Sequence, residues 1–159
     1  MEHAVSARIV GLQVSDGGVP KLPVEAAVVT PTGLVGDRQR NLVYHGGPER
    51  ALCLYSLERI QSLQAEGHPI VPGAAGENVT LEGLDWSTVV PGRRYRLGAE
   101  VTIEITSYTT PCQNIAPSFA EGDYGRISQK THPGDSRVYA RVLRTGTVRV
   151  GDPVEAVEA

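Results

Sequence analysis

The sequence has two cysteines, and their settings suit different roles. Cys112 follows Pro111 just after the alternating segment 101–106, so we expect it where the chain leaves a strand and backbone N–H groups are unpaired. That setting is compatible with a thiolate, although on position alone a small buried side chain at a loop entry is the commoner case. Cys53 lies in segment 51–55, which is apolar at both odd and even positions. This pattern is typical of a strand buried on both faces. We therefore take Cys112 as the candidate reactive thiol and Cys53 as a core residue.

A glycine-rich region at residues 33–39 and 45–50 is a candidate anion site. Paired glycines let the backbone approach a ligand closely, and Arg38 and Arg50 would supply positive charge for a phosphate. Neither the Walker spacing nor the dinucleotide-binding spacing of glycines is present. The alternative is a pair of hairpin turns with solvated arginines. His45 alone is more often a turn or packing residue than a ligand.

Two further candidates are weaker. Residues 73–78 form a flexible loop that enters a strand, and Asn78 could simply close this turn through its own backbone. Zinc ligation by Cys112, His45 and His132 is disfavoured, because their spacing fits no common zinc framework.

Composition limits the class of protein. A chain of 159 residues is long enough for one hydrophobic core. Its 40% hydrophobic and 21% charged residues are typical of a globular protein, and no apolar run reaches the roughly 18 residues that cross a bilayer. The first residues lack a basic segment followed by an apolar one, so we expect no secretory signal. We expect a cytoplasmic protein with two free thiols.

The charge balance argues against two kinds of partner. A net charge of −3 gives no overall attraction for nucleic acid or for an anionic membrane, since both require a basic field. Thirteen of the fifteen cationic residues are Arg, whose planar fork suits phosphate and carboxylate. This bias is a weak indication of anion binding.

A mainly β fold is expected to position these residues. Eighteen Gly and eleven Pro cut the chain into short segments, and residues 101–106 alternate strictly between apolar and polar. Further strands are expected at residues 5–14, 24–30, 51–55, 78–82, 138–143, 147–150 and 154–157. Eight short strands predict a closed or partly closed β-barrel, because closure removes unpaired edges.

The pattern predicts one or two short helices in a single domain. Ser56 is a candidate N-cap for a helix of about three turns that ends at Gly67. A second helix is expected after Pro111, and Pro117 limits it to a turn or two. The sequence shows no internal repeat or linker, so residues 1–159 are expected to form one domain.

Seven motifs occur in the order found in one known family. They are Lys21 near residues 19–20, residues 33–39, residues 45–47 with Arg50, residues 55–56 with Glu58, residues 76–80, residues 111–112, and residues 139–142 before residues 151–152. Over about residues 7–157 the chain resembles MOSC domains, the molybdenum cofactor sulfurase C-terminal domain family. It most resembles the small stand-alone bacterial branch that includes reductases of N-hydroxylated bases.

The resemblance implies a β-barrel that binds the molybdenum cofactor (molybdopterin), with Cys112 as a thiolate that ligates molybdenum or carries sulfur. A soft thiolate is a good molybdenum donor, and the phosphate of the pterin needs cationic and N–H donors. Asp37 is a candidate catalytic residue that would orient Arg38 or a proton-bearing group. The cofactor-binding positions implied by the resemblance are Lys21, Arg38, His45, Gly46, Gly47, Arg50, Glu77 and Asn78.

The chain also departs from the longer members of the family. Sulfurases place a pyridoxal-phosphate-dependent cysteine desulfurase domain ahead of the MOSC part, for which this chain has no room. The longer bacterial reductases continue with a helical extension, whereas this sequence stops about eight residues after Gly151. We therefore expect either a more open site or one completed by a second subunit in a homo-oligomer.

Three functions remain open at this point. We favour a molybdenum-dependent reductase of N-hydroxylated small molecules, with Cys112 on the metal and electrons delivered by separate proteins, since no iron–sulfur or flavin motif is present. The second is a sulfur carrier that receives a persulfide on Cys112 from a separate desulfurase and passes it to an acceptor apo-enzyme. The third is a non-catalytic cofactor storage or delivery protein.

Overall fold

Short strands dominate the computed structural model of the chain, which describes residues 6–37 and 47–158. The strands are β1 Arg8–Val14, β2 Leu22–Val24, β3 Ala26–Thr30, β4 Gly33–Leu34, β5 Leu52–Ser56, β6 Val79–Glu82, β7 Arg94–Leu97, β8 Val101–Tyr108, β9 Val138–Arg144, β10 Gly146–Arg149 and β11 Val154–Val157. The helices are α1 Leu57–Ala65 and the 3-10 helices η1 Pro48–Arg50, η2 Trp86–Thr88, η3 Gln113–Ser118, η4 Ala120–Gly122 and η5 Tyr124–Ile127. The predicted mainly β class is confirmed.

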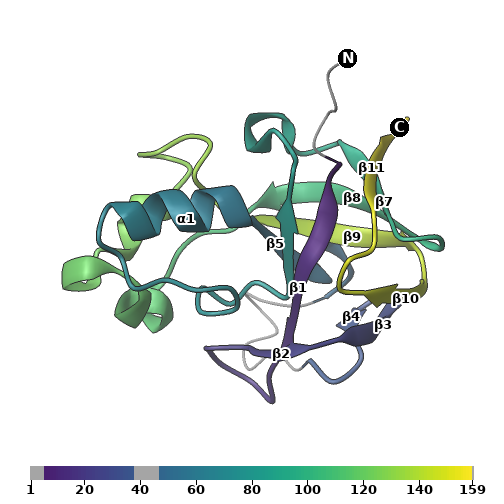
Figure 1. The fold of residues 1–159 in the computed structure, drawn as a ribbon, viewed down its shortest axis with the longest axis horizontal. Coiled ribbons are helices and arrows are strands. Elements are labelled where there is room, and N and C mark those ends of the chain that lie inside the picture. The colour runs from purple at the N-terminus through teal and green to yellow at the C-terminus, as the bar shows by residue number, and fades with distance from the viewer. Residues whose placement is uncertain (1–5, 38–46, 159) are drawn as a thin grey trace.

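The strands form two sheets. The larger has the order β11-β7-β8-β9-β5-β6-β1-β2 and the smaller the order β10-β3-β4. Neighbouring strands are antiparallel except β5 and β6, which are parallel and are linked by the segment that contains α1. A parallel pair needs such a crossover because its two strands start at the same end. Figure 1 shows α1 and the 3-10 helices of residues 113–127 gathered on one side of the strands.

Of the predicted closed or partly closed barrel, the closed form is not found among the described residues, because the larger sheet has two ends, β11 and β2. The edge of β1 that does not pair with β6 has two partners. Leu12–Val14 pairs with β2, and Arg8 forms a bridge with Pro153 in the segment that leads into β11. Three backbone hydrogen bonds of 2.8–2.9 Å join residues 7–9 to residues 151–154, with a single isolated bridge between Arg8 and Pro153. Pro153 has no N–H to extend this ladder.

The eight expected strands all overlap observed ones, with two differences. In β8 the predicted alternation is confirmed, since Val101, Ile103 and Ile105 are buried and their neighbours are more exposed. The expected strand 24–30 divides into β2 and β3, because the chain passes from the large sheet to the small one. We did not expect β4 or β7.

The predicted helix after Ser56 is confirmed as α1. The Ser56 hydroxyl accepts a hydrogen bond from Arg59 N at 3.1 Å, which caps the first turn, and Ile60 and Leu63 are buried. The expected short helix after Pro111 is the 3-10 helix η3. It extends one residue beyond Pro117.

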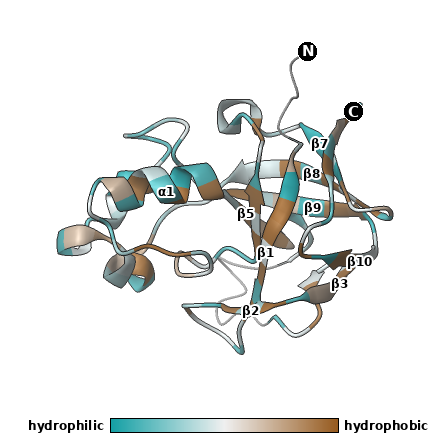
Figure 2. Ribbon diagram, in the orientation of Figure 1, coloured by the Kyte–Doolittle hydropathy of each residue, from teal (hydrophilic) through white to brown (hydrophobic). Residues whose placement is uncertain are grey.

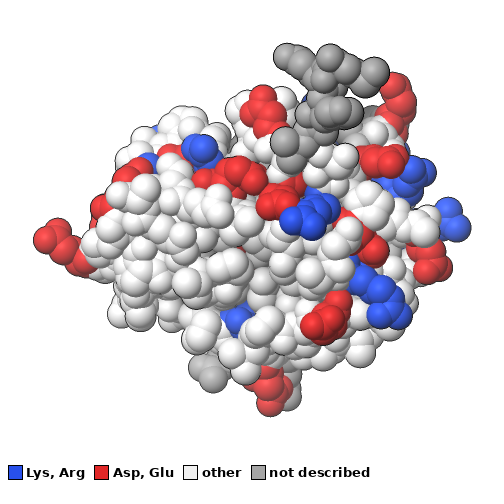
Figure 3. Space-filling model, viewed as in Figure 1, with Lys and Arg blue, Asp and Glu red and all other residues white. Residues whose placement is uncertain are grey.

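The hydrophobic core includes strand residues and Ile60 and Leu63 of α1, and Figure 2 shows that the strands carry both hydrophobic and hydrophilic residues. On the face drawn in Figure 3, acidic and basic side chains are intermixed, which agrees with the small net charge. Among the described residues, no helix is long and apolar enough to span a membrane.

Candidate functional site

A pocket of about 650 Å³ is lined by three of the described candidate residues, Lys21, Arg50 and Cys112. Both cysteines, Cys53 and Cys112, lie on its walls together with three basic residues, Lys21, Arg50 and Arg137. These residues come from four separate segments of the chain. The fold therefore brings a thiol and several positive charges to one cavity, a combination that can bind an anionic ligand and donate sulfur to a soft metal.

Cys112 is half-buried and lies directly before η3. Its carbonyl oxygen accepts a hydrogen bond from Ile115 N at 3.1 Å, which fixes the backbone where the chain turns into the helix. The segment reaches this point four residues after β8 ends at Tyr108. The predicted location of Cys112 beyond a strand end is thus confirmed, and the structure shows that its side chain borders the pocket.

Cys53 has a different environment in β5, where all five residues are buried. Its side chain is only 7% exposed, and its Sγ lies 3.7 Å from the Thr109 hydroxyl. Burial raises the pKa of the Cys53 thiol, because the thiolate loses its hydration. The predicted buried position is confirmed, but we did not expect Cys53 to form part of a pocket wall.

The contrast between the two thiols predicts their reactivity. An alkylating reagent such as iodoacetamide, applied to the native cofactor-free protein, should modify Cys112 well before Cys53, because only Cys112 is accessible and Cys53 is held as a buried thiol. Peptide mass mapping over a time course measures both rates, and labelling of urea-unfolded protein is the control. Equal rates in the native protein, or faster labelling of Cys53, would contradict this assignment.

Lys21 and Asp37 form a buried ion pair at the edge of the pocket. The Lys21 Nζ lies 2.6 Å from Asp37 Oδ1, and both side chains are at most 5% exposed. Asn78 Nδ2 and the Ser15 backbone N–H donate to the same carboxylate at 3.2 and 3.0 Å. The Asn78 Oδ1 accepts from Cys53 N at 2.8 Å, so Asn78 connects this pair to β5. The alternative that Asn78 only closes a turn is wrong.

Arg50 occupies the last position of η1 and borders the pocket. Its guanidinium lies over the Tyr139 ring, 5.5 Å from the centroid, in cation–π geometry. Burial raises the pKa of Tyr139 to about 12, so its hydroxyl remains protonated near neutral pH. Gly47 precedes η1 with a positive φ of 81°. The candidates Arg38, His45 and Gly46 lie outside the described residues.

Glu77 is fully buried beneath the pocket, next to the lining residue Gly76. Neither of its carboxylate oxygens has a hydrogen-bond partner among the described residues. The loss of hydration raises the pKa of Glu77 to about 7, although the Arg137 charge acts in the opposite direction. Glu77 therefore exchanges a proton near neutral pH inside the protein.

Arg137 is a pocket residue that the sequence did not identify. It is 5% exposed, its Nη1 donates to the Ala75 carbonyl at 2.5 Å, and its buried Nε has no hydrogen-bond partner within the described segments. A buried guanidinium with an unused donor at a cavity wall is suited to an anionic ligand. The available sequence signal was an arginine directly before an apolar strand, which is too common to point to a site.

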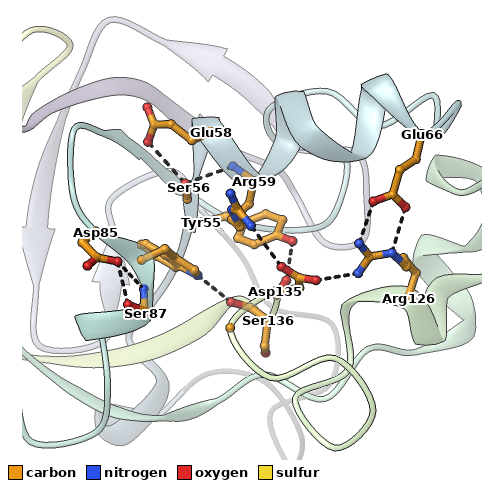
Figure 4. Close-up of polar contacts among 12 residues, drawn as sticks. Tyr55, Ser56, Glu58, Arg59, Glu66, Asp85, Ser87, Arg126, Asp135 and Ser136 are labelled. Atoms are coloured by element: carbon orange, nitrogen blue, oxygen red, sulfur yellow. Dashed lines mark hydrogen bonds and ion pairs between the residues drawn. The ribbon is translucent and has the colours of Figure 1, made fainter.

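A polar cluster holds the segment that precedes Arg137 (Figure 4). Arg126 binds Glu66 at 2.7 and 2.9 Å and Asp135 at 2.6 Å. The Tyr55 hydroxyl donates to the Asp135 carbonyl at 2.5 Å, and the Trp86 indole donates to the Ser136 carbonyl at 2.9 Å. Both residues that precede Arg137 are therefore anchored.

The family model for the MOSC domain matches residues 41–155. Over 140 residues the chain is 33% identical to protein YflK of Bacillus subtilis, and over 144 residues it is 31% identical to protein YiiM of Escherichia coli. Each match covers 87% of this chain but 62% and 63% of those relatives, so the chain spans about three-fifths of their length. A protein of Gibberella moniliformis named as a reductase is 30% identical over 132 residues, which are 80% of this chain and 23% of that one.

Solved structures agree with this relationship. YiiM from Geobacillus stearothermophilus superposes with a TM-score of 0.74 at 26% identity, covering 96% of this chain and 75% of that one. The YUAD protein from Bacillus subtilis has a TM-score of 0.77 at 19% identity and covers 96% of both chains, which shows a shared fold.

Proposed function

Since the chain belongs to the MOSC domain family, we propose that its pocket binds the molybdenum cofactor and that the protein acts in the reduction of N-hydroxylated small molecules. The observation that carries this proposal is the meeting of Cys112 with the cationic side chains of Lys21, Arg50 and Arg137 in one pocket. The relative named as a reductase supports the reaction class.

The residues present fit such a cofactor. Cys112 offers a sulfur donor, which suits molybdenum better than the oxygen donors of other side chains. Lys21 and Arg137 are cations buried at the pocket, and the unused Nε donor of Arg137 suits the phosphate of a pterin. A cavity of about 650 Å³ lies within the range of cofactor sites.

Each part of the pocket receives a role in this proposal. Cys112 ligates the metal, and molybdenum when bound supplies the two-electron chemistry that removes oxygen from an N–O bond. Asp37 fixes the position of Lys21 through their 2.6 Å contact, while Arg50 and Arg137 provide charge for the anionic part of the cofactor. The remaining proposed binding residues are Arg38, His45, Gly46, Gly47, Glu77 and Asn78.

The proposal also requires partners. Separate electron-donor proteins would supply the reducing equivalents in the cytoplasm. In the sulfur-carrier alternative, a cysteine desulfurase would load Cys112 instead, and an acceptor apo-enzyme would receive the sulfur.

Metal and pterin analysis of freshly purified protein tests the proposal. Protein from a host that makes the cofactor and is supplied with molybdate should contain close to one molybdenum and one pterin per chain. Protein from a host defective in pterin synthesis is the matched control and should contain neither. A persulfide on Cys112 without pterin would favour the sulfur carrier, and the absence of metal, pterin and persulfide would contradict all three functions.

A further inference from the structure

We propose that Glu77 is the proton-exchanging partner of Arg137, so that an anion binding in the pocket is accompanied by uptake of one proton from solvent onto the Glu77 carboxylate. The inference deepens the proposed function, on which it rests for the identity of the physiological anion. Its chemistry requires only an anion with permanent charge.

The first observation is the isolation of the Glu77 carboxyl. Its side chain is fully buried, and both oxygens lack a hydrogen-bond partner in the described part of the chain. The nearby backbone N–H groups of Gly73, Ala75 and Glu77 favour the charged form without forming hydrogen bonds of normal geometry. A buried carboxylate in this state is costly, and protonation removes the cost.

The second observation is the position of Arg137. This guanidinium lines the pocket and is the charged side chain that most strongly opposes protonation of Glu77. Its Nη1 donates to the Ala75 carbonyl, two residues from Glu77, and its Nε is unused within the described residues. Arg137 thus borders the pocket, is held at a carbonyl two residues from Glu77 along the chain, and its positive charge acts on the Glu77 carboxyl.

Two other titratable groups of the described residues interact with the charge of Glu77, and neither exchanges a proton near neutral pH. Cys53 and Tyr55 face it from β5, and burial raises the pKa of both, so both stay neutral. The charge of Lys21 is balanced by Asp37 at 2.6 Å. Glu77, with a pKa of about 7, is the group in this cluster whose charge changes there.

The sign of the coupling follows from electrostatics. A bound anion near Arg137 places negative charge close to Glu77, which raises the pKa of its carboxyl further. Anion binding is then accompanied by proton uptake at every pH at which Glu77 is ionised in the ligand-free protein, that is, above about pH 7. Affinity for the anion should be constant below that pH and fall as pH rises above it.

Calorimetric titration with sulfate, which stays a dianion throughout, tests the inference on the full cofactor-free chain between pH 6 and 9. For wild type, affinity should fall up to about tenfold per pH unit above pH 7, the limit for one coupled proton. At about pH 8, titrations in two buffers of different ionisation enthalpy should give close to one proton taken up per sulfate.

Variants assign the proton to Glu77. Glu77→Gln removes the titrating carboxyl, so its sulfate affinity should not change between pH 6 and 9. The matched control is Glu100→Gln, at an exposed glutamate between β7 and β8, which should keep the wild-type profile. Arg137→Gln should weaken sulfate binding at every pH.

Three results would overturn the inference: no sulfate binding by wild type, a pH-independent affinity, or a pH dependence that persists in Glu77→Gln. If Glu77→Gln does not fold, Glu77→Asp replaces it: this variant keeps a carboxyl in a shifted position, and a pH profile identical to that of wild type would overturn the assignment to Glu77. If the protein acquires molybdenum, but its cofactor-free form binds sulfate with an affinity that does not depend on pH, only this coupling is refuted. Protein that never acquires molybdenum but shows proton-coupled sulfate binding would refute only the proposed function.

Discussion

Protein carrying Cys112→Ser is expected to lose most of its molybdenum while keeping its fold. Serine supplies a harder oxygen donor that ionises poorly near neutral pH, so it replaces a thiolate badly as a ligand for this metal. The side chain is half-buried in a loop before η3, so the change should disturb packing little. Molybdenum and pterin per chain, measured after identical gel filtration of wild type and variant, give the result.

Cys53 provides the matched control within the same pocket. Cys53→Ala removes a sulfur that lines the wall but is held as a buried thiol, so the metal content should stay close to that of wild type. Circular dichroism of both variants would establish that each is folded. Full molybdenum occupancy in Cys112→Ser, or loss of metal only in Cys53→Ala, would exclude Cys112 as the essential ligand.

Asp37→Ala is expected to cause the largest loss of stability among changes near the pocket. It leaves the Lys21 ammonium buried without its partner at 2.6 Å, and it removes the acceptor of Asn78 Nδ2 and Ser15 N. Removing one member of a buried ion pair typically costs about 3–5 kcal/mol. Urea unfolding at constant pH and ionic strength measures the change in the free energy of unfolding.

Two comparisons show whether the unpaired buried charge of Lys21 causes the loss of stability in Asp37→Ala. Lys21→Met combined with Asp37→Ala removes both charges and should recover part of the lost stability. Glu155→Ala breaks the exposed pair with Arg96, whose side chains are 58% and 47% accessible, and should change stability little. A similar loss in Asp37→Ala and Glu155→Ala would contradict the account given for the Lys21–Asp37 pair.

Local patterns in the sequence were sufficient to locate most of the elements. The alternation in β8 and the Ser56 cap of α1 are encoded by residues close together in the chain, so they could be predicted directly. The sequence of β7 also alternates, since Tyr95 and Leu97 are buried and Arg94 and Arg96 are more exposed. Four residues are too few for this alternation to predict a strand. The two-residue strand β4 carries no such signal.

Long-range pairing was harder to predict. An open or closed sheet can be built from the same strands, and the choice depends on β2 occupying part of the flank of β1. The same limit applies to the site. Arg137 reaches the pocket because β9 pairs with β5 and because Asp135 and Ser136 are anchored by distant side chains. None of these contacts is visible in the local sequence.

The contact between β1 and residues 151–154 has a consequence for synthesis of the chain. These segments lie near opposite ends of the described sequence, yet they share three backbone hydrogen bonds, and β11 supplies the last strand of the larger sheet. On the ribosome, the first residues of β1 therefore keep an unpaired flank until residues 151–154 have emerged. An exposed strand flank can pair with another chain, and pairing across such a sequence distance is slow. The nascent protein is thus vulnerable to misassembly at β1 throughout the synthesis of the intervening residues.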